Sequence, residues 1–207
     1  SLGSGTDGFK YYDQRRAGLI TTDQWQGIGQ GIARSYGHCM TMGTASTMTA
    51  IADVLGVCLP GASSILAADA NHQRMCTLSG RRIVDMVWED LTPDEILTEV
   101  SVKNASTVAM ALGCSTNAVI HLLAMSRRAG VNLTLDELDE VGRDTPVLAN
   151  IRPIGKQYLM QDFYYAGGLL GLMSVLKDKL DLTALNVTGQ ILGDTLKGAK
   201  VFNQDII

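Results

Sequence analysis

Three capping boxes divide this 207-residue chain into helical segments. They are Thr21-x-x-Gln24, Thr92-x-x-Glu95 and Thr134-x-x-Glu137. In a capping box the first side chain accepts a hydrogen bond from an otherwise unpaired N–H of the first helical turn, and the Glu or Gln side chain accepts one from the capping residue. Each box predicts a helix start, so the chain is expected to be predominantly helical.

Apolar spacing predicts further helices. Residues 43–55 carry apolar side chains at i, i+3, i+4 and i+7, and Gly56 follows where a left-handed residue commonly ends a helix. Ser63 or Ser64 is expected to cap a helix that ends at Gly80. Two helices are therefore expected between residues 43 and 80.

The segment 118–125 is apolar on nearly every helical face, which is typical of a central, buried helix. His121 lies within it and is expected to be a core histidine with a hydrogen-bond partner. A last helix is expected over residues 163–173, where apolar side chains again recur at helical spacing.

Two short segments favour strands. Residues 147–151 and 184–187 are rich in β-favouring side chains and are bounded by Pro, Asn or Gly. No linker, repeat or low-complexity tract interrupts the chain. The expected fold is therefore one predominantly helical α/β domain spanning residues 1–207.

Composition excludes several functional classes. The net charge of −4 gives no basic surface for nucleic acid, and no apolar stretch reaches the roughly 18 residues that a membrane span needs. No basic segment followed by an apolar core opens the sequence, so a cytoplasmic protein is expected. The four cysteines, at positions 39, 58, 76 and 114, show no C-x-x-C spacing. Any metal site must therefore recruit its ligands across the fold.

The loop around Cys39 carries the most unusual chemistry. Gly37 and Gly43 flank the cysteine just before a predicted helix, where free N–H groups favour a thiolate. Thr44 and Ser46 add hydroxyls that could bond to cluster sulfides or to an anionic substrate. A free cysteine is also common as a small buried hydrophobe, so the residues alone leave both interpretations open.

Five segments, in the same order, resemble the dihydroxy-acid dehydratase and 6-phosphogluconate dehydratase family. They are Gly37-x-Cys39-x-x-Met42-x-Thr44-Ala45-x-Thr47-Met48, Leu59–Ser64, Gly113–Leu122, Pro146–Asn150 and Asp162–Gly168. The resemblance runs from about Trp25 to the last residue. It implies that the chain is the central part of the family's N-terminal α/β/α domain, without the C-terminal barrel.

The resemblance implies a hydro-lyase that converts a 2,3-dihydroxy acid into a 2-keto-3-deoxy acid. In the family, three cysteines hold an iron–sulfur cluster, [2Fe–2S] or [4Fe–4S], whose open iron binds the departing C3 hydroxyl. Cys39 matches the last of these three cysteines. A magnesium ion holds the substrate carboxylate and C2 hydroxyl, and a serine alkoxide removes the C2 proton.

The other parts of that machinery have no match in this sequence. The two preceding cluster cysteines, the magnesium ligands and the catalytic serine have no counterpart, so no catalytic residue is assigned and the chain alone is expected to be inactive. The resemblance also implies a homo-oligomer that takes a small hydroxy-acid substrate. His38 and the segment 41–43 look closer to the sugar-acid members. The alternatives are a branched-chain dihydroxy-acid dehydratase and a non-catalytic helical scaffold or oligomerisation module.

The remaining candidates favour structural roles. Cys58 and Cys76 are expected to be packing residues, and Cys114 is expected to belong to a structural cap. Acidic residues gather between positions 85 and 99, where a solvated face is expected rather than a magnesium site.

Overall fold

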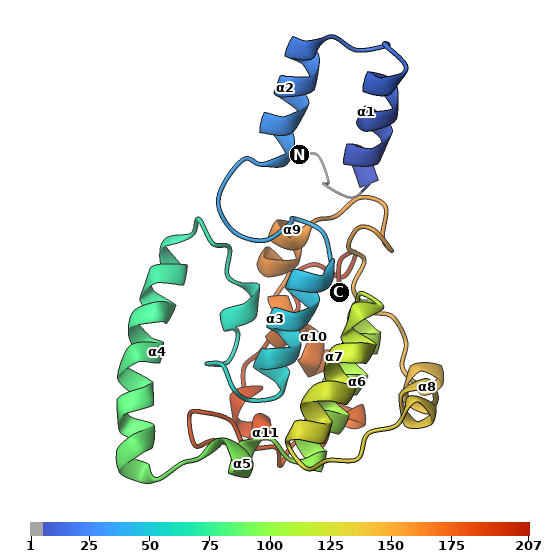
Figure 1. Cartoon of the computed structure of the whole chain (residues 1–207). Helices are drawn as coiled ribbons and strands as arrows, with labels where there is room; N and C mark the ends of the chain where they lie inside the picture. Colours follow the sequence, from blue (N-terminus) through green and yellow to red (C-terminus); the bar gives the residue numbers. More distant parts are fainter. Residues whose placement is uncertain (1–5) are drawn as a thin grey trace.

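Helices make up almost all of the regular structure in residues 6–207, which are the residues that the computed structural model describes (Figure 1). The α-helices are α1 (Thr6–Arg16), α2 (Thr22–Ile32), α3 (Thr44–Val54), α4 (Ala70–Glu89), α5 (Pro93–Ile96), α6 (Glu99–Leu112), α7 (Asn117–Arg128), α8 (Leu135–Asp144), α9 (Met160–Tyr165), α10 (Gly168–Val175) and α11 (Leu192–Thr195). Two short 3-10 turns, η1 (Ala62–Ser64) and η2 (Lys177–Lys179), complete them. The predominantly helical fold is confirmed.

Two of the three predicted capping boxes are formed in full, and at Thr92 only the bond to the Glu95 carboxylate is present, which accepts from the Thr92 N–H at 3.1 Å. At the start of α2 the Gln24 N–H donates to the Thr21 hydroxyl at 3.2 Å, and α8 begins in the same way after Thr134. The box at Thr92 starts only the single turn α5. A second cap at Thr98, which accepts from the Ser101 N–H, then starts α6. The predicted helix is thus divided in two, because two caps lie six residues apart.

The central helix is α6, and it packs against α3, α7 and α8. Its alanines at positions 105, 109 and 111 are fully buried, and such small side chains let the neighbouring helices approach closely. The prediction that 118–125 would be buried on every face is wrong. In α7 only one stripe is buried, with Leu122 at 2% exposure, whereas Ile120 and His121 face outward. His121 is therefore not a core histidine.

The helix expected after Ser63 or Ser64 begins later and ends later. Residues 62–64 form the turn η1, and the side chain of Asp69 caps α4, which continues through Gly80 to Glu89. The predicted helix over 163–173 is divided into α9 and α10 at Gly167, which has φ 125°. In the described residues, no helix combines the length and apolarity needed to cross a bilayer.

The two predicted strands do not form. Each contributes one residue to an isolated bridge: Ile151 pairs with Tyr158, and Leu185 pairs with Ile191. Residues 6–207 contain no longer ladder, so the expectation of an α/β sheet is wrong for this part of the chain. The physical reason is that a strand needs a neighbouring strand. Here the Leu148 N–H donates to the Ala111 carbonyl oxygen at the end of α6, and residues 184–187 bond to the Gly56 carbonyl oxygen and to residues 190–192 of the turn that follows.

Asn104 joins α6 to the segment before α11 and generates a test of the core. Its side chain donates to the Asp181 carbonyl oxygen at 2.8 Å and accepts from the Asp181 N–H at 2.9 Å. Because Asn104 is only 1% exposed, Asn104→Ala should lower the free energy of unfolding by about 1–3 kcal/mol. Urea unfolding measures this. Asn132→Ala, at an exposed position, is the control, and an equal effect of both changes would contradict the role of Asn104.

Candidate functional site

Cys39 lies in the loop that connects α2 to α3, as predicted, and its side chain is exposed. Backbone hydrogen bonds hold both sides of it. The Met160 N–H donates to the Met40 carbonyl oxygen at 2.7 Å, and the Met42 N–H donates to the Arg152 carbonyl oxygen at 2.8 Å. Met42 is 3% exposed and so anchors the loop in the core. The Cys39 thiol therefore lies on a short exposed segment whose backbone is hydrogen-bonded to the protein on both sides of the cysteine.

The hydroxyls after Cys39 are used within the protein. The Ser46 hydroxyl donates to the Thr41 carbonyl oxygen at 2.8 Å and accepts from the Gly43 N–H at 3.1 Å. Thr47 is fully buried and donates to the Met42 sulfur at 3.6 Å. These groups fix the loop and the first turn of α3, so Ser46 and Thr47 do not face a ligand.

A polar cluster joins the start of α3 to the start of α7. The Asn117 side-chain amide donates to the Thr44 hydroxyl at 2.9 Å, and the Ser115 and Thr44 hydroxyls are 3.0 Å apart. The Ser115 N–H also donates to the Thr47 hydroxyl at 3.1 Å. Two of the five motif segments, far apart in the sequence, are thereby held against each other.

The other motif segments gather around the same helices. The Leu169 N–H, just past the segment 162–168, donates to the Ser64 hydroxyl at 2.9 Å. The Leu148 N–H donates to the Ala111 carbonyl oxygen at the end of α6, at 2.8 Å. The tertiary structure therefore brings all five segments into one region around α3 and α6.

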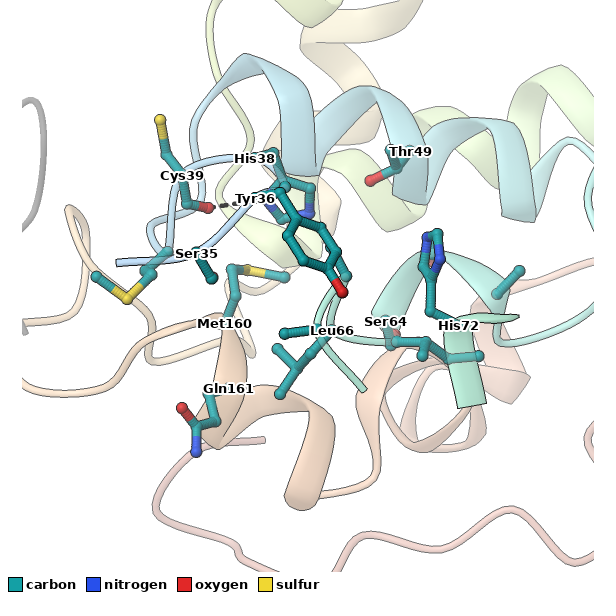
Figure 2. Close-up of a pocket in the computed structure, with 17 residues that line it drawn as sticks. Ser35, Tyr36, His38, Cys39, Thr49, Ser64, Leu66, His72, Met160 and Gln161 are labelled. Carbon is teal, nitrogen blue, oxygen red and sulfur yellow. Dashed lines mark hydrogen bonds between the residues drawn. The ribbon is translucent and has the colours of Figure 1, made fainter. Parts of the chain in front are cut away.

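A cavity of about 310 Å³ lies beside the Cys39 loop (Figure 2). Residues 35–40, 62–68, Thr49, His72, Met160 and Gln161 line it. The His38 ring nitrogen Nδ1 lies 2.7 Å from the Cys39 carbonyl oxygen, and because a carbonyl only accepts, Nδ1 carries the proton. In Figure 2 the Cys39 sulfur points away from Tyr36 and His72. Cys39 thus lines the cavity while its sulfur is directed away from these two side chains.

Asp53 on α3 holds the turn 59–64 against this cavity. Its carboxylate accepts from the Ser63 hydroxyl at 2.7 Å, the Ser63 N–H at 3.0 Å and the Gly61 N–H at 3.2 Å. Burial raises the pKa of Asp53 from 3.8 to about 6, although the hydrogen bonds from Ser63 and Gly61 act in the opposite direction. Sequence reasoning did not single out Asp53, because a lone aspartate on a helix carries no local signal of burial.

The other predicted residues lie elsewhere. Cys58 and Cys114 are half-buried, and burial raises the pKa of both thiols. Cys76 is exposed on α4, so the expectation that it packs in the core is wrong. The acidic residues between positions 85 and 99 are exposed, as expected for a solvated face. Among the described residues no group of three His, Cys, Asp or Glu side chains could hold a metal ion.

Comparison with known proteins assigns the class. Residues 3–195 match the sequence family described as "Dihydroxy-acid/6-phosphogluconate dehydratase N-terminal". The chain belongs to this dehydratase family.

The chain is also similar in sequence to individual members of the family. The chain is 49% identical to 6-deoxy-6-sulfo-D-gluconate dehydratase of Pseudomonas putida, over 99% of the chain and 35% of the relative. It is 43% identical to L-arabinonate dehydratase of Rhizobium leguminosarum bv. trifolii, over 100% and 36%. It is 38% identical to dihydroxy-acid dehydratase of Caldanaerobacter subterraneus subsp. tengcongensis, over 93% and 35%. The chain thus spans about a third of the length of these relatives.

The raised pKa of Asp53 predicts a pH-dependent stability. Between about pH 4 and pH 6 the folded state binds more protons at this group than the unfolded state, so stability falls as the pH rises through that window. A shift of about two units corresponds to about 3 kcal/mol. Asp53→Asn should remove this dependence. Urea midpoints at pH 4, 5, 6 and 7 measure it, and a constant difference between natural protein and variant would contradict the prediction.

Thiol reactivity should follow exposure. Because the thiolate is the reactive form, Cys39 and Cys76 should be alkylated by iodoacetamide several-fold faster than Cys58 and Cys114, whose pKa values are raised. Peptide mass spectrometry at short reaction times gives the order. In urea the four rates should converge. Labelling of folded Cys114 as fast as Cys76 would show that the start of α7 opens readily.

Proposed function

We propose that the natural protein containing this chain is a dehydratase of sugar acids, and that Cys39 is one ligand of its iron–sulfur cluster. The observation that carries the proposal is the setting of Cys39, which is exposed on a loop held on both sides by backbone hydrogen bonds. A cluster ligand needs an accessible sulfur on a backbone that moves little, because the cluster tolerates small changes in ligand position poorly.

The donor set fits one ligand of such a cluster. Thiolate is the ligand that iron–sulfur clusters use, and the Cys39 sulfur points outward from the loop (Figure 2). Among the described residues, Cys39 belongs to no group of three or more His, Cys, Asp or Glu side chains that could hold a metal ion, so we propose that the remaining ligands come from outside residues 6–207. When bound, the cluster would supply a Lewis acid for the departing C3 hydroxyl, and its type is left open as [2Fe–2S] or [4Fe–4S].

The chain's own residues would position that ligand. The backbone hydrogen bonds of Met40 and Met42 fix the position of the loop relative to the core. The His38 ring nitrogen Nδ1 is hydrogen-bonded to the Cys39 carbonyl oxygen. The polar cluster at Thr44 ties the start of α3 to α7. The proposed reaction also uses a magnesium ion and a serine base. No residue of this chain is assigned as a magnesium ligand or as the base.

A sugar acid is the favoured substrate. The chain is 49% and 43% identical to relatives named for 6-deoxy-6-sulfo-D-gluconate and L-arabinonate, against 38% for a relative named dihydroxy-acid dehydratase. His38 and the segment 41–43 also resemble the sugar-acid members. A branched 2,3-dihydroxy acid is the second candidate, and comparing kcat/KM for L-arabinonate, D-gluconate and a branched dihydroxy acid decides between them.

The ligand assignment predicts the behaviour of Cys39→Ser in the natural protein. Iron and sulfide per chain should fall to a small fraction of the unchanged protein, and keto-acid formation should be lost, because the cluster loses a thiolate. Cys76→Ser changes an exposed cysteine on α4 and should leave iron and turnover unchanged. Circular dichroism checks that both variants fold. Full iron content in Cys39→Ser would contradict the assignment.

A further inference from the structure

The exposed side of α4 has an unusual composition. This helix of 20 residues lies at the edge of the molecule, and Met86 is its only buried residue (Figure 1). Its last two turns expose large apolar side chains: Ile83 and Val84 are just over half exposed, Val87 is 72% exposed and Trp88 is 84% exposed. An apolar patch of this kind marks an interaction surface, because leaving it in water is unfavourable.

The patch follows the geometry of a helix packing face. Gly80, Val84 and Trp88 are spaced four residues apart and therefore form one stripe. Ile83 and Val87 lie beside it. Gly80 has no other residue within 4 Å of the position a Cβ would take, so the packing of this chain does not require a glycine there. A glycine inside an exposed helix costs about 0.5–1 kcal/mol, and its use suggests that another helix approaches at this point.

The stripe is complementary to itself. If a second copy packs antiparallel about a two-fold axis through Val84, each residue n positions before Val84 lies opposite the residue n positions after it. Gly80 then faces Trp88 of the second copy, so the largest side chain of the stripe meets the open backbone of the smallest residue. The symmetry repeats this contact at both ends of the interface.

The charges beside the stripe fit the same arrangement. Arg81 and Asp85 are exposed on one flank of α4, and within the described chain they form no ion pair with each other. In the two-fold packing, Arg81 lies two residues, about 3 Å along the axis, from Asp85 of the second copy. The symmetry again gives two such pairs. On the other flank, Ile83 lies two residues, about 3 Å along the axis, from Val87 of the second copy, and the two form an apolar contact.

We infer that α4 is a self-association surface, which packs antiparallel against α4 of a second copy with Val84 on the two-fold axis. The inference does not rest on the dehydratase proposal, since its observations are the shape, apolarity and charge of α4 alone. Two helices about 30 Å long form only part of a standard interface of about 800 Å² per partner, so neighbouring surfaces of the natural protein complete it.

Charge reversal tests the arrangement in the natural protein. Arg81→Asp and Asp85→Arg each turn two attractive pairs into repulsive ones, and each should raise the dissociation constant of the α4-mediated contact by about tenfold. Mixing the two variants should restore association as a heterodimer, because both cross-pairs are then attractive. Changes within one helix cannot produce this restoration. Native mass spectrometry of the mixture measures it, and a mixture that associates no better than either variant alone overturns the inference.

A cysteine on the proposed axis gives a second, independent measurement. In a Cys76→Ser background, Val84→Cys should form a disulfide with its own copy under mild oxidation, because residues on a two-fold axis face themselves. Leu78→Cys, half exposed on another side of α4, is the matched control and should cross-link far more slowly. Equal cross-linking of both variants overturns the inference. So does protection of the introduced thiol of Val84→Cys from maleimide without cross-linking, which would mean that another part of the natural chain covers α4.

Discussion

The packing of α3 against α6 is the contact on which the rest of the structure depends. The buried alanines of α6 leave no bulk between the two helices, so α3 lies deep in the core, with Ile51 and Leu55 each at 1% exposure. The start of α3 is thereby fixed relative to α6 and α7. The Cys39 loop leads directly into that start, so the position of the thiol is set by a packed core and not by the loop alone.

Burial of polar groups is tolerated because each has a partner. Asp53, Asn104 and Thr47 are buried with hydrogen bonds to backbone or side-chain groups from distant parts of the chain. In the described residues, no buried side-chain nitrogen or oxygen lacks a partner. An unpaired polar group would cost about 1–3 kcal/mol, so these bonds select one arrangement of the helices over others. The Thr47 bond holds the first and third motif segments together, and the Asp53 bond holds the second against α3.

The surface presents two features of different kinds. The Cys39 loop exposes a thiol, which we propose as a cluster ligand, whereas α4 exposes an apolar helix face, which we propose as a self-association surface. The chain spans about a third of the length of the relatives it matches.

The sequence by itself determined the helix starts, because capping is local: Thr21, Thr92 and Thr134 each form hydrogen bonds with the residue three positions later. It also determined the loop position of Cys39 and, through the ordered motifs, the family. It did not reveal that α6 rather than α7 is the central helix. The polar residues of α6 make its sequence resemble that of an exposed helix, and the hydrogen-bond partner of Asn104 is remote in the sequence. The prediction of strands at residues 147–151 and 184–187 was wrong for the same reason. Burial and strand pairing depend on which distant segments meet, and only the tertiary structure decides that.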